Sequence, residues 1–325
     1  MSESNRKSHY CKECREHVES AHRTERPSHK VFSFGAKLTK PRPEQFKFRL
    51  LYPPRTLPPE LDLSPNFING GFTQAFRQGE QGSCTANCGV ADFIYRQIIG
   101  NAWNKQLYSR AFLYAATRII EGTFPEDSGS MMETIGKVLG SQGVCFDSTM
   151  PYTDQDCATN PDARAIAEAL QWTTDAKQTR LTWNETLQVL NELGPVRLGT
   201  PVPQSFTEAG PDGFIPVPDP DEPIVGGHAM LPLGYKKRKG PDDVVRLYRK
   251  VLNSWGSDFG DQQDPLNCIW MPDEYGQVYA SDLDIWVQLD SKPGPGGSPT
   301  PQPTPAGLHL RLQRKNGSWK TLWQL

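Results

Sequence analysis

The sequence "QGSCTANC", residues 81–88, places two cysteines four residues apart behind a glycine. In the residues that follow, "CTANCGVADFIYRQIIG", hydrophobic side chains recur at helical spacing, and Gly100 is expected to end the helix. A helix that begins here puts Cys84 at its N-terminus, where unpaired N–H groups and the helix dipole favour a thiolate. Cys88 falls one turn inside, a position typical of a buried side chain. The stretch therefore predicts a helix with a nucleophile at its start rather than a pair of metal ligands.

A cysteine nucleophile needs a base, a group that orients the base, and a donor for the oxyanion. Of the six histidines, only His228 lies in the central part of the chain, behind two glycines in "VGGHAMLPLGY". A single histidine in a core is usually structural, but this one begins a predicted strand. Asn253, in "VLNSWGSDFG", is placed to accept the imidazole N–H, and Trp255 to shield that bond from water. Gln78 can donate its amide to an oxyanion beside the backbone N–H of Cys84.

In this order the motifs resemble the papain family (C1) of cysteine peptidases: Gln78, Gly82-Ser83-Cys84, Gly227-His228-Ala229 and Asn253-Ser254-Trp255-Gly256. The histidine and the asparagine follow the cysteine by 144 and 169 residues, near the spacing of that family. The resemblance covers about residues 58–290. It implies an α+β, two-lobed fold, with a helical N-terminal lobe around the nucleophile helix, a C-terminal lobe of antiparallel strands, and the active-site cleft between them.

By this resemblance the protein is a thiol-dependent endopeptidase that acts on peptides or proteins through an acyl-enzyme. Cys84 is then the nucleophile, His228 the general acid/base, Asn253 the residue that orients it and Gln78 the oxyanion donor. The resemblance implies no cofactor. The same residues would serve an amidase or a transpeptidase. The alternative outside enzymes is a binding module that kept the fold and has zinc-binding or nucleic-acid-binding ends.

Five residues are expected to bind substrate. Gly129, in "EDSGSMM", is the candidate for contacts with the substrate backbone, although it also suits a turn before a helix. Gly199 and Ala229 are expected to line a roomy apolar pocket. Gly227 and Trp255 flank the histidine and the asparagine and complete the set.

The sequence departs from the family at several positions. The family usually has cysteine at the position of Gln81, and a half-cystine where Ala116 stands, so Cys157 loses its partner. Thr85 and Phe259 stand where the family often has tryptophan. These departures imply a fold without the family's disulfides, like the GSCTAN-type bacterial and viral members, and they agree with a reducing compartment.

Composition narrows the location and the partners. The start of the chain is polar and unlike a signal peptide, and no apolar run reaches the length of a membrane span. The expectation is a cytoplasmic or other reducing compartment, with export without a leader left open. Net charge is +6 for residues 1–50, −12 for 51–307 and +4 for 308–325. Basic ends on an acidic body suit docking of the ends, and nucleic acid is the less expected partner.

Residues 1–57 are a candidate pro-segment, the protein's own inhibitor lying over the cleft, because they combine aromatic residues, positive charge and prolines. The same region contains Cys11, Cys14, His17 and His22, a weak candidate for a zinc site. A polar extension without a metal is the alternative interpretation.

The rest of the chain divides into the peptidase domain, 58–290, a Pro/Gly linker, 291–307, and a basic aromatic tail, 308–325. In the domain, helices are predicted for "YSRAFLYAATRIIEG", "MMETIGKVLGSQG" and "NETLQVLNELG", and strands for "GPVRLGTPV", "HAMLPLGYKK", "VVRLYRKVLNSW" and "NCIWMP". The tail contains Asn-Gly between two alternating runs, which predicts a β-hairpin or, if it does not dock, a frayed end.

Overall fold

The computed structural model describes residues 32–174, 177–289, 310–313 and 319–323. The chain separates into two units, Met1–Phe32 and Ser33–Leu325, and the fold below is that of the second unit. Residues 33–57, which the sequence analysis grouped with the N-terminal extension, thus belong to the same compact unit as the peptidase domain. The zinc candidates Cys11, Cys14, His17 and His22 lie outside the described residues.

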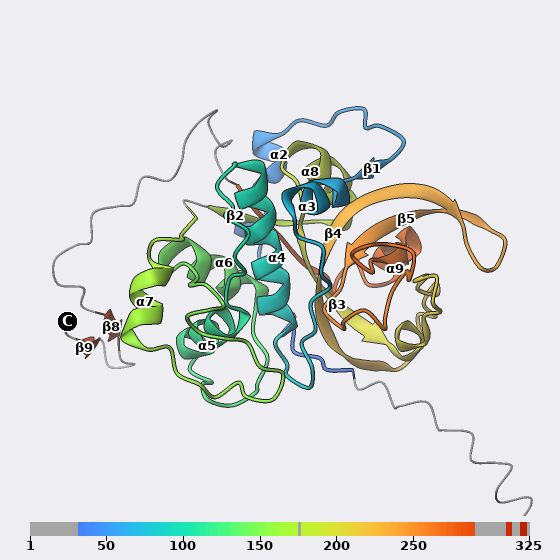
Figure 1. The fold of residues 1–325 in the computed structure, drawn as a ribbon. Coiled ribbons are helices and arrows are strands. Elements are labelled where there is room, and N and C mark those ends of the chain that lie inside the picture. Colours follow the sequence, from blue (N-terminus) through green and yellow to red (C-terminus); the bar gives the residue numbers. More distant parts are fainter. Residues whose placement is uncertain (1–31, 175–176, 290–309, 314–318, 324–325) are drawn as a thin grey trace, which may run out of the picture. The chain divides into compact units, whose positions relative to one another are not determined.

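The first half of the unit is helical (Figure 1). Its helices are α2 (Phe48–Leu51), α3 (Ser64–Gly70), α4 (Cys84–Ile99), α5 (Arg110–Glu121), α6 (Met132–Ser141) and α7 (Ala163–Ala169), and α8 (Thr186–Glu192) and α9 (Asp273–Val278) follow among the strands. The predicted nucleophile helix is confirmed as α4, which begins at Cys84 and ends before Gly100. The predictions of α5, α6 and α8 are also confirmed, whereas α3, α7 and α9 were not predicted.

The second half is an antiparallel sheet. Its strands are β1 (Leu61–Asp62), β2 (Gln178–Leu181), β3 (Arg197–Pro203), β4 (Ile224–Lys239), β5 (Val245–Leu252), β6 (Ile269–Pro272) and β7 (Asp284–Gln288). In the described part they form one seven-stranded sheet in the order β2-β7-β3-β4-β5-β6, with β1 paired to β4. The four predicted strands are confirmed as β3 to β6, and the fold is the α+β arrangement expected from the sequence.

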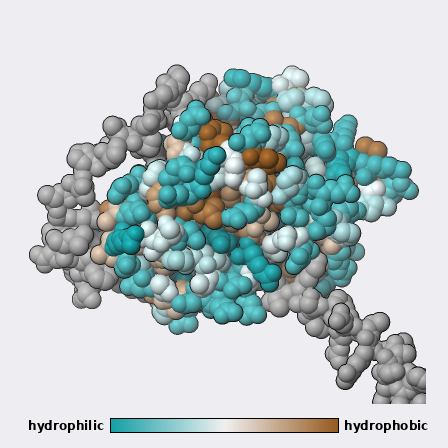
Figure 2. Space-filling view, in the orientation of Figure 1, coloured by the Kyte–Doolittle hydropathy of each residue, from teal (hydrophilic) through white to brown (hydrophobic). Residues whose placement is uncertain are grey.

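Helix α4 lies between the other helices and the sheet, as Figure 1 shows. Its first twelve residues, Cys84–Tyr95, are all buried, so this helix forms the centre of the core rather than an amphipathic surface. An ion pair between Asp92 of α4 and Arg197 of β3 (3.7 Å) joins the helix to the sheet. The face seen in Figure 2 is mainly hydrophilic, with hydrophobic residues gathered over the region of α3 and α4.

Residues 43–57 pack on the sheet, away from the cleft that Cys84 faces. Thr179 of β2 donates its hydroxyl to the carbonyl of Gln45 (2.7 Å), and Arg49 pairs with Glu185 (3.2 Å). The side chain of Phe48 is buried in these contacts. Phe48, one of the aromatic residues of the candidate pro-segment, is therefore part of the body's own core and does not lie over the cleft.

The structure reports on two further predictions. All five cysteines of the described residues (Cys84, Cys88, Cys145, Cys157 and Cys268) are free, which confirms a disulfide-free fold for that part of the chain. In the tail, β8 (Leu310–Gln313) pairs with β9 (Trp319–Trp323) in antiparallel register, which confirms the predicted strand pairing. No helix among the described residues is long and apolar enough to cross a membrane.

Candidate active site

Cys84 is the first residue of α4, and its side chain is fully buried. Backbone N–H groups of Ala229, Gly35 and Thr85 lie within hydrogen-bonding reach of the sulfur. Ala229 follows His228 on β4, so the sulfur lies near the strand that carries the imidazole. The N-terminus of a helix and several N–H donors favour negative charge on the sulfur.

His228 is held by Asn253, which directly follows β5. The imidazole Nε2 lies 2.7 Å from Asn253 Oδ1, which also accepts the backbone N–H of Ser254 (2.7 Å). An oxygen that accepts at Nε2 fixes the neutral tautomer with its proton there and leaves Nδ1 as the basic nitrogen. Nδ1 is buried and makes no hydrogen bond with any described residue. The ring of Trp255 stacks on the imidazole at a centroid distance of 4.4 Å, covering the Asn253 bond as expected.

Gln78 is fixed in front of the nucleophile loop. Its Oε1 accepts the hydroxyl of Ser254 (2.6 Å), so the side chain is tied to the residue after Asn253. Its amide nitrogen donates to the carbonyls of Gln81 (2.8 Å) and Ser33 (3.1 Å). A carbonyl of the chain's own N-terminal segment thus already takes one amide hydrogen of the predicted oxyanion donor.

Residues 33–40, which we call the cleft segment, lie across Cys84. Gly35 and Ala36 both donate their N–H groups to the carbonyl of Gly227 (3.1 and 3.0 Å). On the other wall, Ser130 donates to the carbonyl of Gly35 (2.8 Å) and accepts from Lys37 N (3.0 Å), which makes a parallel bridge. The segment is thus hydrogen-bonded to both walls, as an extended peptide would be.

Glycines make this close approach feasible. A Cβ atom on Gly35 would lie 1.7 Å from the carbonyl oxygen of Gly82, inside the nucleophile loop. Gly129 has a φ of +69°, and a Cβ on it would lie 2.1 Å from the Gly35 oxygen. Gly129 thus lies in a turn before α6 and approaches the backbone of Gly35 closely, while its contact with a substrate backbone stays a prediction.

The side chains of the cleft segment occupy the predicted substrate-binding positions. Phe34 packs edge-on against Trp255, with ring centroids 5.8 Å apart. Leu38 lies against Gly199 and Gly227, where added Cβ atoms would be 3.1 and 3.5 Å from it. Of the two small residues predicted to line an apolar pocket, Gly199 thus lies against a leucine of the segment.

The sequence did not predict one ion pair and one group of hydrogen bonds that hold the segment. Lys37 pairs with Glu121 at the end of α5 (3.2 Å). The backbone N–H and hydroxyl of Thr39 both donate to Asp284 Oδ2 (3.2 and 3.0 Å), and Arg180 donates to the Thr39 carbonyl (2.6 Å). Arg180 and Asp284 are both buried and pair with each other at 3.2 Å. No short motif marks these residues, because each lies far in sequence from its partner.

The protonation states of Cys84 and His228 differ from the thiolate that the sequence predicts for Cys84. With the segment in place, burial raises the pKa of Cys84 to about 11 and lowers the pKa of His228 to about 4. Both shifts have the same cause, since water is excluded and each group loses the solvation of its charged form. The expectation of a lowered thiol pKa is therefore wrong for the covered protein, which holds a neutral thiol beside a neutral imidazole.

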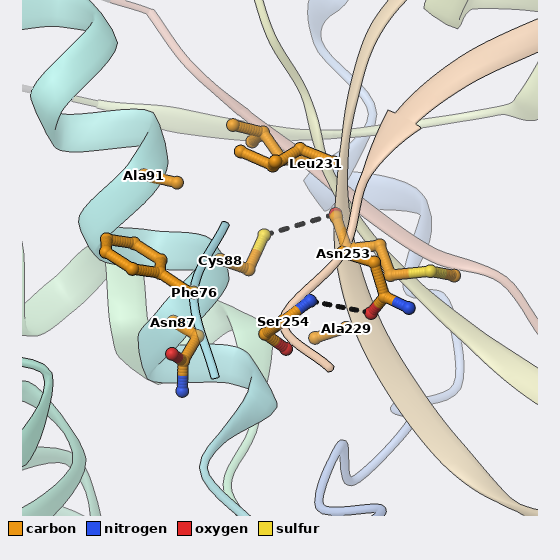
Figure 3. Close-up of a pocket in the computed structure, with 10 residues that line it drawn as sticks. Phe76, Asn87, Cys88, Ala91, Ala229, Leu231, Asn253 and Ser254 are labelled. Carbon is orange, nitrogen blue, oxygen red and sulfur yellow. Dashed lines mark hydrogen bonds between the residues drawn. The ribbon is translucent and has the colours of Figure 1, made fainter. Parts of the chain in front are cut away.

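Cys88 has a structural role, as predicted from its position one turn into the helix. Its sulfur donates to the carbonyl of Met230 on β4 (3.1 Å), and Figure 3 shows it pointing across a small cavity toward that strand. Thr85, which replaces a family tryptophan, hydrogen-bonds the hydroxyl of Ser130 in the cleft wall. Within the described ranges, no three Cys, His, Asp or Glu side chains are grouped so as to hold a metal ion.

Comparison with known proteins agrees with this site. The model of the papain family cysteine proteases matches residues 57–263. The chain therefore belongs to this family and is a cysteine-type peptidase, a hydrolase.

Three relatives illustrate the similarity. Xylellain, a cysteine protease from Xylella fastidiosa, has 27% sequence identity and a TM-score of 0.67, and the match covers 83% of this chain and 100% of that structure. An uncharacterised peptidase C1-like protein of Acanthamoeba polyphaga mimivirus is 27% identical over 65% of this chain and 68% of its own length. The ragweed pollen protease Amb a 11 in its proform shares the fold, with 16% identity, a TM-score of 0.57, and coverage of 74% of this chain and 68% of that one.

Proposed function

We propose that this peptidase is an endopeptidase in which Cys84 is the nucleophile and His228 the general acid/base. The observation that carries the proposal is the 2.7 Å bond between His228 Nε2 and Asn253, which leaves Nδ1 as the base beside a cysteine at a helix N-terminus. Nδ1 takes the thiol proton, and the thiolate attacks a peptide carbonyl carbon. The imidazolium then gives its proton to the leaving amine, and a water molecule activated by Nδ1 releases the acyl group from sulfur.

Asn253 and Gln78 complete the proposed mechanism. Asn253 accepts from Nε2 throughout and so keeps Nδ1 toward the sulfur. The amide of Gln78 and the backbone N–H of Cys84 stabilise the oxyanion that forms during attack. Gly129, Gly199, Gly227, Ala229 and Trp255 would bind the substrate, since the cleft segment already occupies the space beside them.

The contacts of the cleft segment support cleavage within a chain. Its backbone is extended and hydrogen-bonded to Gly227 on one wall and Ser130 on the other, so the cleft accommodates an extended peptide. We therefore expect unfolded proteins or internal stretches of peptides to be substrates.

We further propose that the cleft segment inhibits the enzyme. It places the N–H of Gly35, a hydrogen-bond donor, toward the sulfur of Cys84. Its Leu38 lies against Gly199 and Gly227, and its Ser33 carbonyl takes a hydrogen of Gln78. The proform of the ragweed pollen protease, which shares this fold, is in keeping with such a segment.

The catalytic proposal is tested by incubating the protein and two variants with an unfolded protein and a thiol reductant. Cys84→Ala should lower hydrolysis by about 1,000-fold or more, because the nucleophile is lost. Cys88→Ala, which removes a buried thiol one turn away, should keep most of the activity and serves as the matched control. Fragments with internal cleavage sites would support an endopeptidase, and hydrolysis that persists in Cys84→Ala would refute the role of Cys84.

A further inference from the structure

The loop that precedes Cys84 is tied to the opposite wall of the cleft by one carboxylate. Asp127 accepts the backbone N–H of Gly82 with both oxygens, each at 3.1 Å. From this geometry we infer that Asp127 is a positioning residue, which sets the place of the nucleophile relative to the wall that binds substrate backbone. The inference rests on the proposed function, because it concerns the same reaction.

A tyrosine extends the connection to the backbone-binding wall. Tyr114 of α5 donates its hydroxyl to Asp127 Oδ1 (2.5 Å) and accepts the N–H of Gly129 (2.9 Å). Burial raises the pKa of Tyr114, so the hydroxyl keeps the proton that it donates. The chain Gly82–Asp127–Tyr114–Gly129 therefore joins the nucleophile loop to the wall residue that lies against the cleft segment.

The fit around Gly82 is close. A Cβ atom placed on this glycine would be 3.3 Å from Asp127 Oδ1 and 3.3 Å from the Tyr114 hydroxyl. The neighbouring Gln81 stands where the resemblance implies a half-cystine, and its side chain instead donates to the carbonyl of Thr153. The loop before Cys84 thus has no covalent tie, and hydrogen bonds to fixed partners replace it.

The chemistry of the contact explains why a carboxylate serves here. An ionised carboxylate is acceptor-only, and its two oxygens can take one N–H and one O–H without a competing donor. An asparagine in place of Asp127 would turn its amide N–H₂ group toward the N–H of Gly82 or the hydroxyl of Tyr114, and two donors cannot hydrogen-bond each other. Displacement of a reacting group by about 1 Å can lower the rate by about 100-fold. The Asp127–Gly82 contact therefore affects the rate most if it holds Cys84 at attack distance from a bound carbonyl.

The test uses the full chain and two measurements. Amide hydrogen exchange of Gly82, followed by NMR, should be at least about tenfold faster in Asp127→Ala and in Asp127→Asn than in the wild type, because the acceptor is lost or opposed by a donor. On an unfolded protein substrate, Asp127→Ala should lower kcat by about tenfold or more. Tyr114→Phe keeps the carboxylate on Gly82, so it should mainly raise KM through Gly129. Glu126→Gln, a neighbouring surface carboxylate, is the control and should change neither.

The outcomes separate this inference from the proposed function. Unchanged exchange at Gly82 in both Asp127 variants would overturn it, and so would unchanged kcat in Asp127→Ala. If kcat fell equally in Asp127→Ala and Tyr114→Phe, in step with a loss of thermal stability, Asp127 would be structural only and the inference would also fail. A wild-type chain that still hydrolyses nothing after residues 1–40 are removed would count against the proposed function, while the exchange of Gly82 in the full chain would still decide whether Asp127 holds the loop.

Discussion

At the scale of single residues, the chemistry of the site depends on water. Cys84 and His228 are both fully buried beneath the cleft segment, and burial shifts their pKa values away from an ion pair. Removal of the segment would admit water, which stabilises the thiolate and the imidazolium together. The covered and open forms should therefore differ in reactivity more than in structure.

The first prediction concerns the alkylation of Cys84 by iodoacetamide as a function of pH. In the full chain, a thiol pKa of about 11 leaves little thiolate at pH 7, so the rate should be low and should rise as pH approaches 11. In a chain that begins at Pro41, the rate at pH 7 should be at least about tenfold higher, since a thiolate–imidazolium pair can form. Identical pH profiles for the two forms would contradict this account of the pair.

The second prediction concerns Asn253. Asn253→Ala removes the acceptor that fixes the tautomer of His228, so kcat should fall by about 10- to 100-fold, the usual cost of losing an orienting partner. Cys84→Ala should abolish activity, whereas Asn253→Ala should retain some. Complete loss in the asparagine variant, with circular dichroism unchanged, would argue against a purely orienting role.

The sequence was sufficient for some residues and not for others. Cys84, His228 and Asn253 stand in short motifs whose residue types match their chemistry, and the structure joins His228 to Asn253 by a hydrogen bond. Glu121 and Asp284 contact Lys37 and Thr39 of the cleft segment, from which they are far apart in sequence. No spacing rule connects residues at such separations. The raised thiol pKa could not be predicted either, because it depends on what covers the sulfur.

At the scale of elements, the cleft segment is held by backbone contacts that only glycine permits. A methyl group on Gly35 would lie 1.7 Å from the Gly82 oxygen, a distance that neither backbone can accommodate without moving. This contact joins the cleft segment, which we propose to be inhibitory, to the loop before Cys84, but Gly35 has no part in the proposed chemistry.

The third prediction follows from this contact. Gly35→Ala should displace the segment and raise kcat/KM of the full chain by about tenfold or more. The expected control is Gly210→Ala, because Gly210 is exposed and only the side chain of Asp212 lies near its added Cβ (3.1 Å). If Gly35→Ala left kcat/KM at the wild-type value, the segment would not be inhibitory in the way proposed.

Some helices and strands could be predicted from the sequence and others could not. Helix α4 and strands β3 to β5 were predicted from long periodic or β-branched runs. Strands β2 and β7 were missed because they are short and bury polar side chains, such as Arg180 and Asp284, whose pairing offsets the cost of burial only in the folded chain. Charge and proline content also do not reveal that Phe48 is buried within the same unit as the peptidase domain.

At the scale of the whole molecule, the described fold is held by its core and its hydrogen bonds without disulfides. The fourth prediction is that the thermal midpoint is the same with and without a reductant, within about 1 °C, because no covalent cross-link is lost among the described residues. Differential scanning fluorimetry of the full chain measures this. A midpoint several degrees lower in reductant would show a bridge that involves Cys11 or Cys14.

Opposite charges of the ends and the body should assist the inhibited state. The positive first fifty residues precede a negative body, and Lys37 pairs with the buried carboxylate of Glu121. The attraction is screened by salt, so binding of the segment should weaken as ionic strength rises. Residues 43–57 contribute to the body itself, and a truncation that tests inhibition should therefore begin at Pro41 and keep them.

The most direct test of the central claim is the hydrolysis of an unfolded protein by the chain that begins at Pro41, with and without a synthetic peptide of residues 1–40, and with Cys84→Ala in parallel. We expect rapid hydrolysis by the truncated chain, suppression by the added peptide that weakens at high salt, and none in the Cys84 variant. Equal kcat/KM for truncated and full chains together with no inhibition by the peptide, or hydrolysis that survives in Cys84→Ala, would contradict a thiol peptidase covered by its own segment.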